Sequence, residues 1–168
     1  MTVKDAIKSR RSIRKYKPGT EIPEEHIHYM LESAMMAPSA CNKRPWEFVV
    51  IKSEEAKETI LSIHPYATHF KDASIAILVC ARPELQEGIA EGYFPQDCGA
   101  AIQNILLAAT DSGYGSCWCG IYPRAERVEL FRKTLNLTST PLGLVIIGVA
   151  DESPEPRGYY DETKVTFI

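Results

Sequence analysis

The sequence predicts an α+β fold, in which helices and a sheet form separate layers. Helical patterns alternate with apolar runs of strand length, but these runs are few and irregularly spaced, which argues against a doubly wound sheet. Of the 168 residues, 45% are hydrophobic and 24% are charged, as in ordinary globular proteins. We therefore expect residues 1–168 to form a single domain with its own core.

Helix signals recur along the chain. Thr2 and Asp5 match a capping box, so a short helix opens the sequence. Pro23 suits the first turn of a second helix, and Ser53 suits the N-cap of a third. Residues 124–135 form a further helical pattern. The second helix has one apolar stripe, which we expect to be buried: Ile27, Met30, Leu31, Ala34 and Met35.

The most strongly patterned helix covers residues 94–112. It is apolar on most of its sides and rich in glycine and alanine, so other elements can approach it closely. We expect it to be a core helix that also packs against a second subunit. Met35 and Met36, which precede a polar loop, are interpreted as core residues rather than as part of a cofactor site.

Strands are predicted at residues 46–52, 74–81 and 142–150, where β-branched and apolar residues are concentrated. Residues 82–92 are polar and predict a loop or a mobile lid. The alternating segment 164–168 suits a strand that pairs with a neighbouring chain.

Residues 113–123 contain glycines that resemble a dinucleotide-binding motif. Trp118 stands where the third glycine would be needed, and a helix precedes the segment where a strand should. We therefore reject a Rossmann interpretation and expect a glycine-containing loop.

The net charge of −3 argues against bulk attraction to nucleic acid or to anionic membranes. Residues 8–17 nevertheless carry only basic charges, on Lys8, Arg10, Arg11, Arg14, Lys15 and Lys17. The arginine fork matches phosphate, and Ser12 adds a hydroxyl donor. This segment predicts a local anion site. The alternatives are a solvated basic face and a nucleic-acid contact, which the lack of interleaved aromatic residues disfavours.

The five cysteines are Cys41, Cys80, Cys98, Cys117 and Cys119. Their odd number, without an export signal or an apolar run long enough to cross a bilayer, predicts reduced thiols in a cytoplasmic protein. Cys117 and Cys119 form a C-x-C pair rather than the C-x-x-C of zinc sites. We expect no metal site and interpret the cysteines as structural or incidental.

A rigid polar loop is predicted between Pro38 and Pro45, because each proline fixes its own backbone and restricts the residue before it. The predicted second helix precedes this loop and the first strand follows it. Loops held in this way often carry chemistry, although an ordinary surface turn has the same pattern.

Four motifs in this order resemble the nitroreductase superfamily of FMN-dependent oxidoreductases, in a short form that covers almost the whole chain. They are Ser9-Arg10-Arg11-Ser12 with Arg14, residues 38–46, the Asp97-x-Gly99 helix that leads to residues 115–118, and Pro156-Arg157. The resemblance implies a central, mostly antiparallel sheet flanked by helices. It also implies an intertwined homodimer with two FMN molecules at its interface.

The resemblance also assigns the site residues. The FMN phosphate would be held by Arg10, Arg11, Ser12, Arg14 and Arg157. The other subunit would border the ring and ribityl chain with Pro38, Ser39, Ala40 and Asn42. Backbone amides near Cys119 and Gly120 would approach flavin N5 and O4. Arg44 or His69 would stabilise negative charge at the pyrimidine edge of the flavin. The sequence does not distinguish between them, and the alternative for both is a side chain exposed to solvent without this role.

The function implied is reduction of nitroaromatics, quinones or similar small acceptors by NAD(P)H in a ping-pong mechanism. FMN carries this chemistry, which agrees with the lack of a convincing Ser/His/Asp or Cys/His set. The alternatives are a non-catalytic FMN-binding or flavin-sensing protein, and the reductive dehalogenation or flavin fragmentation performed by other superfamily members.

Overall fold

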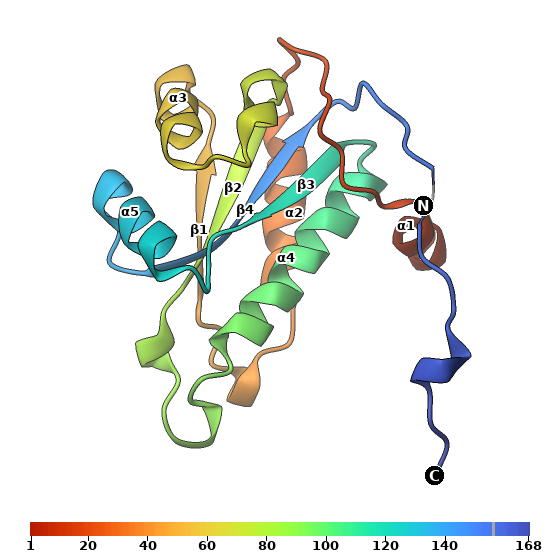
Figure 1. Ribbon diagram of the computed structural model, residues 1–168, viewed down its shortest axis with the longest axis vertical. Helices are drawn as coiled ribbons and strands as arrows, with labels where there is room; N and C mark the ends of the chain where they lie inside the picture. The colour runs from red at the N-terminus through yellow and green to blue at the C-terminus, as the bar shows by residue number, and fades with distance from the viewer. Residues whose placement is uncertain (156) are drawn as a thin grey trace.

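The fold is a sheet between two helical layers. The computed structural model describes residues 1–155 and 157–168. In this part of the chain, four strands pair in the order β1 (Trp46–Ile51), β2 (Ile75–Ala81), β4 (Thr140–Gly148) and β3 (Gly115–Gly120). Every neighbouring pair is antiparallel (Figure 1). The predicted α+β fold and its antiparallel sheet are therefore confirmed.

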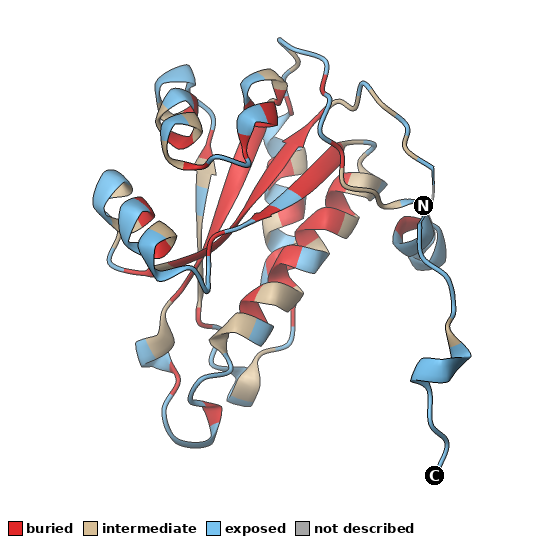
Figure 2. Cartoon of the chain, in the orientation of Figure 1, coloured by how far each residue is buried: buried red, intermediate tan, exposed pale blue. Residues whose placement is uncertain are grey.

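Two helices cover each face of the sheet (Figure 1). One face packs against α2 (Glu24–Met35) and α4 (Phe94–Asp111), and the other against α3 (Glu54–Ile63) and α5 (Ala125–Leu135). Alternate residues of β2 enter the two cores, because successive side chains of a strand point to opposite faces. All of β2 is buried (Figure 2), which agrees with its continuous run of apolar residues.

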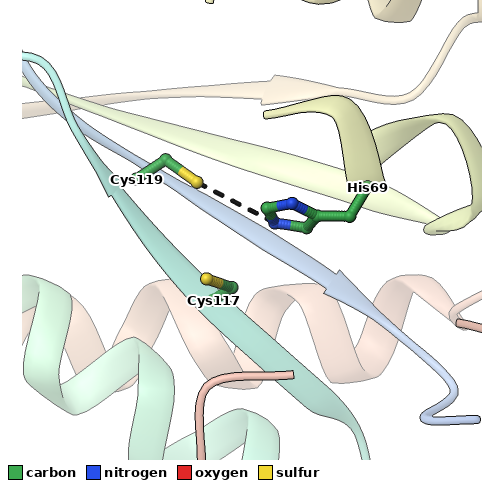
Figure 3. Close-up of side chains that lie close together, drawn as sticks. All are labelled: His69, Cys117 and Cys119. Atoms are coloured by element: carbon green, nitrogen blue, oxygen red, sulfur yellow. Dashed lines mark hydrogen bonds between the residues drawn. The ribbon is translucent and has the colours of Figure 1, made fainter. Parts of the chain in front are cut away.

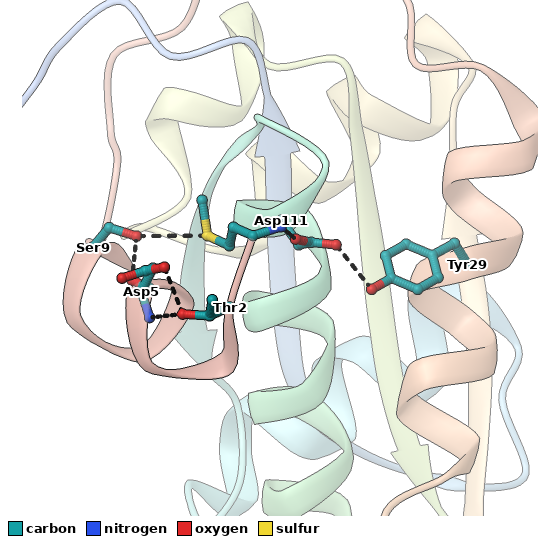
Figure 4. A network of polar contacts seen from close by, with 6 residues as sticks. Thr2, Asp5, Ser9, Tyr29 and Asp111 are labelled. Atoms are coloured by element: carbon teal, nitrogen blue, oxygen red, sulfur yellow. Dashed lines mark hydrogen bonds and ion pairs between the residues drawn. The ribbon is translucent and has the colours of Figure 1, made fainter.

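Helix α1 (Val3–Ser9) lies beside the C-terminal end of α4. The Thr2 side chain accepts a hydrogen bond from the amide of Asp5, which confirms the predicted cap. The amino group of Met1 forms an ion pair with Asp111 at 2.6 Å, and the Tyr29 hydroxyl donates to the same carboxylate at 3.1 Å (Figure 4). These two hydrogen bonds lower the pKa of Asp111. Helices α1, α2 and α4 thus meet at one carboxylate.

The segment after α1 lies along the outer edge of β3. Ser12 forms a parallel bridge with Ser116, whose carbonyl accepts a hydrogen bond from the amide of Ile13 at 2.9 Å. Gly115 makes this approach possible, because a Cβ there would lie 2.9 Å from three side-chain atoms of Ile13. The arginine-rich segment is therefore attached to the sheet.

Strand β3 corrects the prediction of a loop at residues 113–123. From Cys117 to Gly120 the residues alternate between buried (Cys117, Cys119) and exposed (Trp118, Gly120), as in a half-buried strand. The glycines at both ends of the strand hid this alternation. Strand β4 also begins and ends two residues earlier than residues 142–150.

Two predicted core residues lie at the surface. Met35 is 50% exposed and Met36 is 77% exposed, because they lie off the buried stripe of α2, which includes Ala34 in the same turn. Ile27, Met30 and Ala34 are buried as predicted.

The connecting segments carry short 3-10 turns: η1 (Ala40–Asn42), η2 (Thr68–Asp72), η3 (Pro83–Leu85), η4 (Gly88–Ala90) and η5 (Glu162–Lys164). Residues 82–92 form a loop, as predicted, with Gln86 and Ala90 buried in it. The C-terminal tail leaves the body near the N-terminus and extends away from it (Figure 1), and Phe167 is 91% exposed. Within the described residues, every helix is too short or too polar to cross a membrane.

The contact between Gly115 and Ile13 can be tested by substitution. Gly115→Ala should lower the free energy of unfolding by about 1–3 kcal/mol, the usual cost of overpacking, and should raise amide exchange at Ile13. Denaturant unfolding and hydrogen exchange measure the two effects. Gly120→Ala is the matched control, since a Cβ there meets no atom within 4 Å. Equal losses of stability in the two variants would contradict the proposed role of Gly115.

Candidate functional site

The outer edge of β3 presents backbone groups in a regular order. In an antiparallel strand the N–H and C=O of one residue point to the same side, and the side alternates along the chain. The Ser116 carbonyl points outward to Ile13, so Trp118 and Gly120 also direct their backbone groups outward. The Gly120 carbonyl accepts a hydrogen bond from Arg127 at 2.7 Å. The Gly120 N–H thus lies at an exposed edge, as the predicted contact with a flavin ring requires.

The basic segment lies along the same edge. Arg10, Arg11 and Ser12 are half-buried and Arg14 is exposed. The Nε of Arg11 is buried and has no hydrogen-bond partner among the described residues. Arg11 also lines a hollow of about 220 Å³. An orphaned guanidinium donor of this kind suits an anionic ligand such as a phosphate.

The loop between Pro38 and Pro45 has a strained backbone. Cys41, Asn42 and Arg44 have φ angles of 50°, 54° and 49°, in the left-handed region that residues with a Cβ seldom adopt. The Ser39 hydroxyl accepts the Arg44 amide at 3.0 Å, and the Asn42 side-chain oxygen accepts Arg44 Nε at 3.0 Å. Such strain concentrates at functional sites. The loop is therefore held by its own hydrogen bonds, as the rigid-loop prediction requires.

One buried carboxylate holds this loop against the rest of the chain. Asp97, in the first turn of α4, accepts the Ala40 amide at 3.2 Å with each of its oxygens. Gln86 also donates to Asp97, at 2.6 Å. Asp97 thus joins the Pro38–Pro45 loop to residues 82–92. The sequence singled out Asp97 as part of a motif but did not show this role.

The predicted site residues form two groups that lie far apart in one chain. The loop lies at the start of α4, whereas the basic segment lies near its end (Figure 1). The 18 residues of α4 span about 27 Å. Arg157 is exposed on the tail, and its convergence with Arg10 and Arg14 stays a prediction. Pro156 lies outside the described residues.

The two residues predicted for the pyrimidine edge have different surroundings. Arg44 is exposed in the loop, whereas His69 is buried in η2 behind β3. The His69 Nε2 atom lies 3.9 Å from the Cys119 sulfur, and Cys117 completes a cluster of three side chains (Figure 3). The interaction between the two thiols lowers the pKa of Cys117 and raises the pKa of Cys119. Residue spacing does not reveal this cluster, because 50 residues separate His69 from Cys119.

An aromatic hollow of about 300 Å³ lies beside Gly120. Trp118 and Tyr122 line it, and Phe94 packs edge-on against Tyr122 with ring centroids 5.4 Å apart. Trp118 lies directly over Gly143, where a Cβ would be 2.3 Å from its indole nitrogen. The hollow suits a planar ring.

Comparison with known proteins gives consistent matches. The model of the Nitroreductase family matches residues 7–64 and 62–149. A "Putative NADH dehydrogenase/NAD(P)H nitroreductase" of Methanothermobacter thermautotrophicus is 42% identical over 167 residues, which cover 98% of this chain and 86% of that protein.

Solved structures give the same result. A crystal structure of the same description from Bacteroides thetaiotaomicron matches with a TM-score of 0.88 and 36% identity. The match covers 97% of this chain and 95% of the other chain. The FMN-dependent nitroreductase of Clostridium difficile R20291 has a TM-score of 0.85 and 28% identity, and covers 98% of each chain.

The role of Asp97 can be tested by removing its charge. Asp97→Asn should lower the free energy of unfolding by about 1–3 kcal/mol, since an amide cannot replace all three accepted hydrogen bonds. Amide exchange at Ala40 should rise as the loop loosens. Asp111→Asn, at the exposed end of the same helix, should cost less than about 1 kcal/mol. An unchanged Ala40 amide in Asp97→Asn would show that the loop does not depend on this carboxylate.

Proposed function

The chain belongs to the nitroreductase family, and on that premise we propose that it is an FMN-dependent oxidoreductase. It uses NAD(P)H to reduce nitroaromatics, quinones or similar acceptors by a ping-pong mechanism. The names of the relatives from M. thermautotrophicus and C. difficile support the proposal, since one names NAD(P)H and the other FMN. We place the enzyme in the cytoplasm, which its five free thiols support.

The observation that carries the proposal is the outer edge of β3. One strand has the basic segment attached at Ser116 and an outward N–H at Gly120. These two residues are about 13 Å apart along the strand. A phosphate and a planar ring joined by a ribityl chain can reach donors at both positions. The orphaned Nε of Arg11 and the exposed amide of Gly120 therefore both fit FMN.

We assign the phosphate to Arg10, Arg11, Ser12 and Arg14, with Arg157 closing the site from the tail. Four arginine guanidinium groups and one serine hydroxyl suit a dianion, because hydrogen bonds assisted by charge are stronger than those between neutral groups. The amides near Cys119 and Gly120 orient the ring. Pro38, Ser39, Ala40 and Asn42 border it from the other subunit.

Bound FMN supplies the redox chemistry, accepting hydride from NAD(P)H and passing electrons to the acceptor. The protein positions these partners and stabilises charge. The hollow at Trp118 and Tyr122 offers one place for a planar ring, so donor and acceptor use it in turn, which is the basis of ping-pong turnover. Arg44 or His69 stabilises negative charge at the pyrimidine edge.

A homodimer explains the separation of the two groups of site residues. Within one chain the loop and the basic segment lie at opposite ends of α4, and we propose that the loop that borders each FMN comes from the other copy. Val3 and Ile7 on α1, and Met35 and Met36 on α2, are exposed and suit a subunit contact.

The tail offers a second contact. In the described residues nothing pairs with the outer edge of β1. We propose that residues 164–168 of one copy pair with this edge in the other copy, which also covers an exposed strand edge.

The cofactor assignment has a direct test. The purified protein should be yellow, bleach with NADPH or NADH, and recover its colour with a nitroaromatic or a quinone. Arg10→Ala and Arg14→Ala should each weaken FMN binding by about 10- to 150-fold, the equivalent of one charge-assisted hydrogen bond. Arg132→Ala, on the surface of α5, should bind FMN normally. A protein that neither binds FMN nor is stabilised by it would refute the assignment.

The rival functions differ in their products. A non-catalytic flavin-binding protein would bind FMN without steady-state NAD(P)H oxidation. Reductive dehalogenation would release halide, and flavin fragmentation would consume the ring. Parallel lines in double-reciprocal plots of initial rates with a nitroaromatic would support ping-pong turnover.

The dimer contact of the tail can be tested by two charges on neighbouring residues. In a strand, Phe167 and Thr166 point to opposite faces. Phe167→Asp should weaken dimerisation and reduce FMN retention, because it places a charge against an apolar surface. Thr166→Asp should change both much less. Analytical ultracentrifugation measures the effect, and equal behaviour of the two variants would contradict this contact.

A further inference from the structure

We propose that His69, Cys117 and Cys119 form a binding site for a thiophilic d10 cation, Zn²⁺ or Cu⁺ (Figure 3). The proposal does not depend on FMN, because it rests on side chains that point into the layer between β3 and η2, away from the outer edge of the strand. Cys117 and Cys119 are alternate residues of β3, so they share one face, and His69 faces them from η2.

The three donor atoms are already close. The imidazole nitrogen and the two sulfurs all lie within 4.8 Å of one another, and Cys119 Sγ lies 3.9 Å from His69 Nε2. A cation with Zn–S bonds of about 2.3 Å and Zn–N bonds of about 2.0 Å separates its donors by about 3.5–4 Å. The widest pair therefore needs to contract by about 1 Å, which small side-chain rotations provide.

The donor set selects the class of metal. Two sulfurs and an imidazole favour Zn²⁺ and Cu⁺, whereas Mg²⁺ and Ca²⁺ prefer oxygen. On binding, each coordinating thiol releases its proton to solvent, and the lone pairs of sulfur and nitrogen form the new bonds. The backbone carbonyl of Tyr66, 3.8 Å from Cys119 Sγ, or a water supplies the fourth position that Zn²⁺ requires.

The surrounding residues hold the ligands in place. Tyr16 stacks on His69 with ring centroids 6.1 Å apart, so the imidazole is restrained before a metal arrives. His69 is 9% exposed and Tyr66 is 70% exposed, so the site lies just beneath the surface. If a metal is bound to His69 Nε2, Arg44 is the remaining candidate to stabilise negative charge at the pyrimidine edge of the flavin.

Metal titration tests the proposal. The reduced full-length protein should bind about one equivalent of Zn²⁺ or Co²⁺, and Co²⁺ should show thiolate charge-transfer absorption. Anaerobic competition with a chromophoric chelator measures Cu⁺ and decides between the two cations. Cys117→Ser and Cys119→Ser should each reduce the absorption, because one of the two thiolate ligands is lost, and should weaken binding by about 100-fold or more; His69→Ala should weaken binding too. Cys41→Ser, an exposed cysteine outside the cluster, should leave both unchanged.

X-ray absorption of the wild-type complex keeps the test independent of how the variants fold. Two sulfur neighbours and one imidazole nitrogen around the metal would support the site. Three results would overturn it: the absence of stoichiometric binding for all three metals, equal binding by a folded Cys117→Ser variant, and a metal surrounded only by nitrogen and oxygen.

Discussion

The attachment of the basic segment to the edge of β3 is the constraint on which the candidate site depends. The segment carries several positive charges within a few residues and would remain apart from the sheet without a fixed contact. Backbone hydrogen bonds hold it in place: the Ile13 amide donates to the Ser116 carbonyl, and the Lys17 amide donates to the Val149 carbonyl. Because Gly115 has no side chain, Ile13 can lie against the strand. The same register turns the N–H of Gly120 outward. One pairing therefore places the basic segment, which can bind an anion, and the Gly120 amide, which can contact a flavin ring.

The fold could be predicted largely from periodicity. β2 is a continuous apolar run, and α4 has a helical repeat over its full length, so both were evident from residue pattern. β3 was not, because its glycines and small residues look like a turn, and its alternation becomes visible only once burial is known. Met35 and Met36 show the reverse error, because an apolar side chain that lies off the buried stripe of its helix remains exposed.

The parts of the candidate site that could be predicted are those whose residues lie close together in the sequence. Clustered arginines indicate an anion, and two prolines flanking polar residues indicate a rigid loop. The contacts of Asp97 with Ala40 and Gln86, and of His69 with Cys119, join residues distant in sequence. No spacing rule finds such contacts, since they depend on how the helices and turns pack on the sheet. The left-handed backbone at Cys41 and Asn42 was equally hidden, because neither residue is a glycine.

Strand β3 keeps three kinds of contact separate through its geometry. Its outer edge offers backbone groups, and its two faces offer side chains that alternate between Trp118 on one side and Cys117 and Cys119 on the other. A ligand at the edge therefore contacts amides without displacing the sulfurs, and a cation on the sulfurs leaves those amides in place. His69 is the exception, because its imidazole is a candidate for both sites. A ring nitrogen that donates its lone pair to a metal cannot also bind a proton there, so metal occupancy would decide which positive group remains for the flavin. The physical competition is therefore for one histidine, and the rest of the strand is compatible with both ligands.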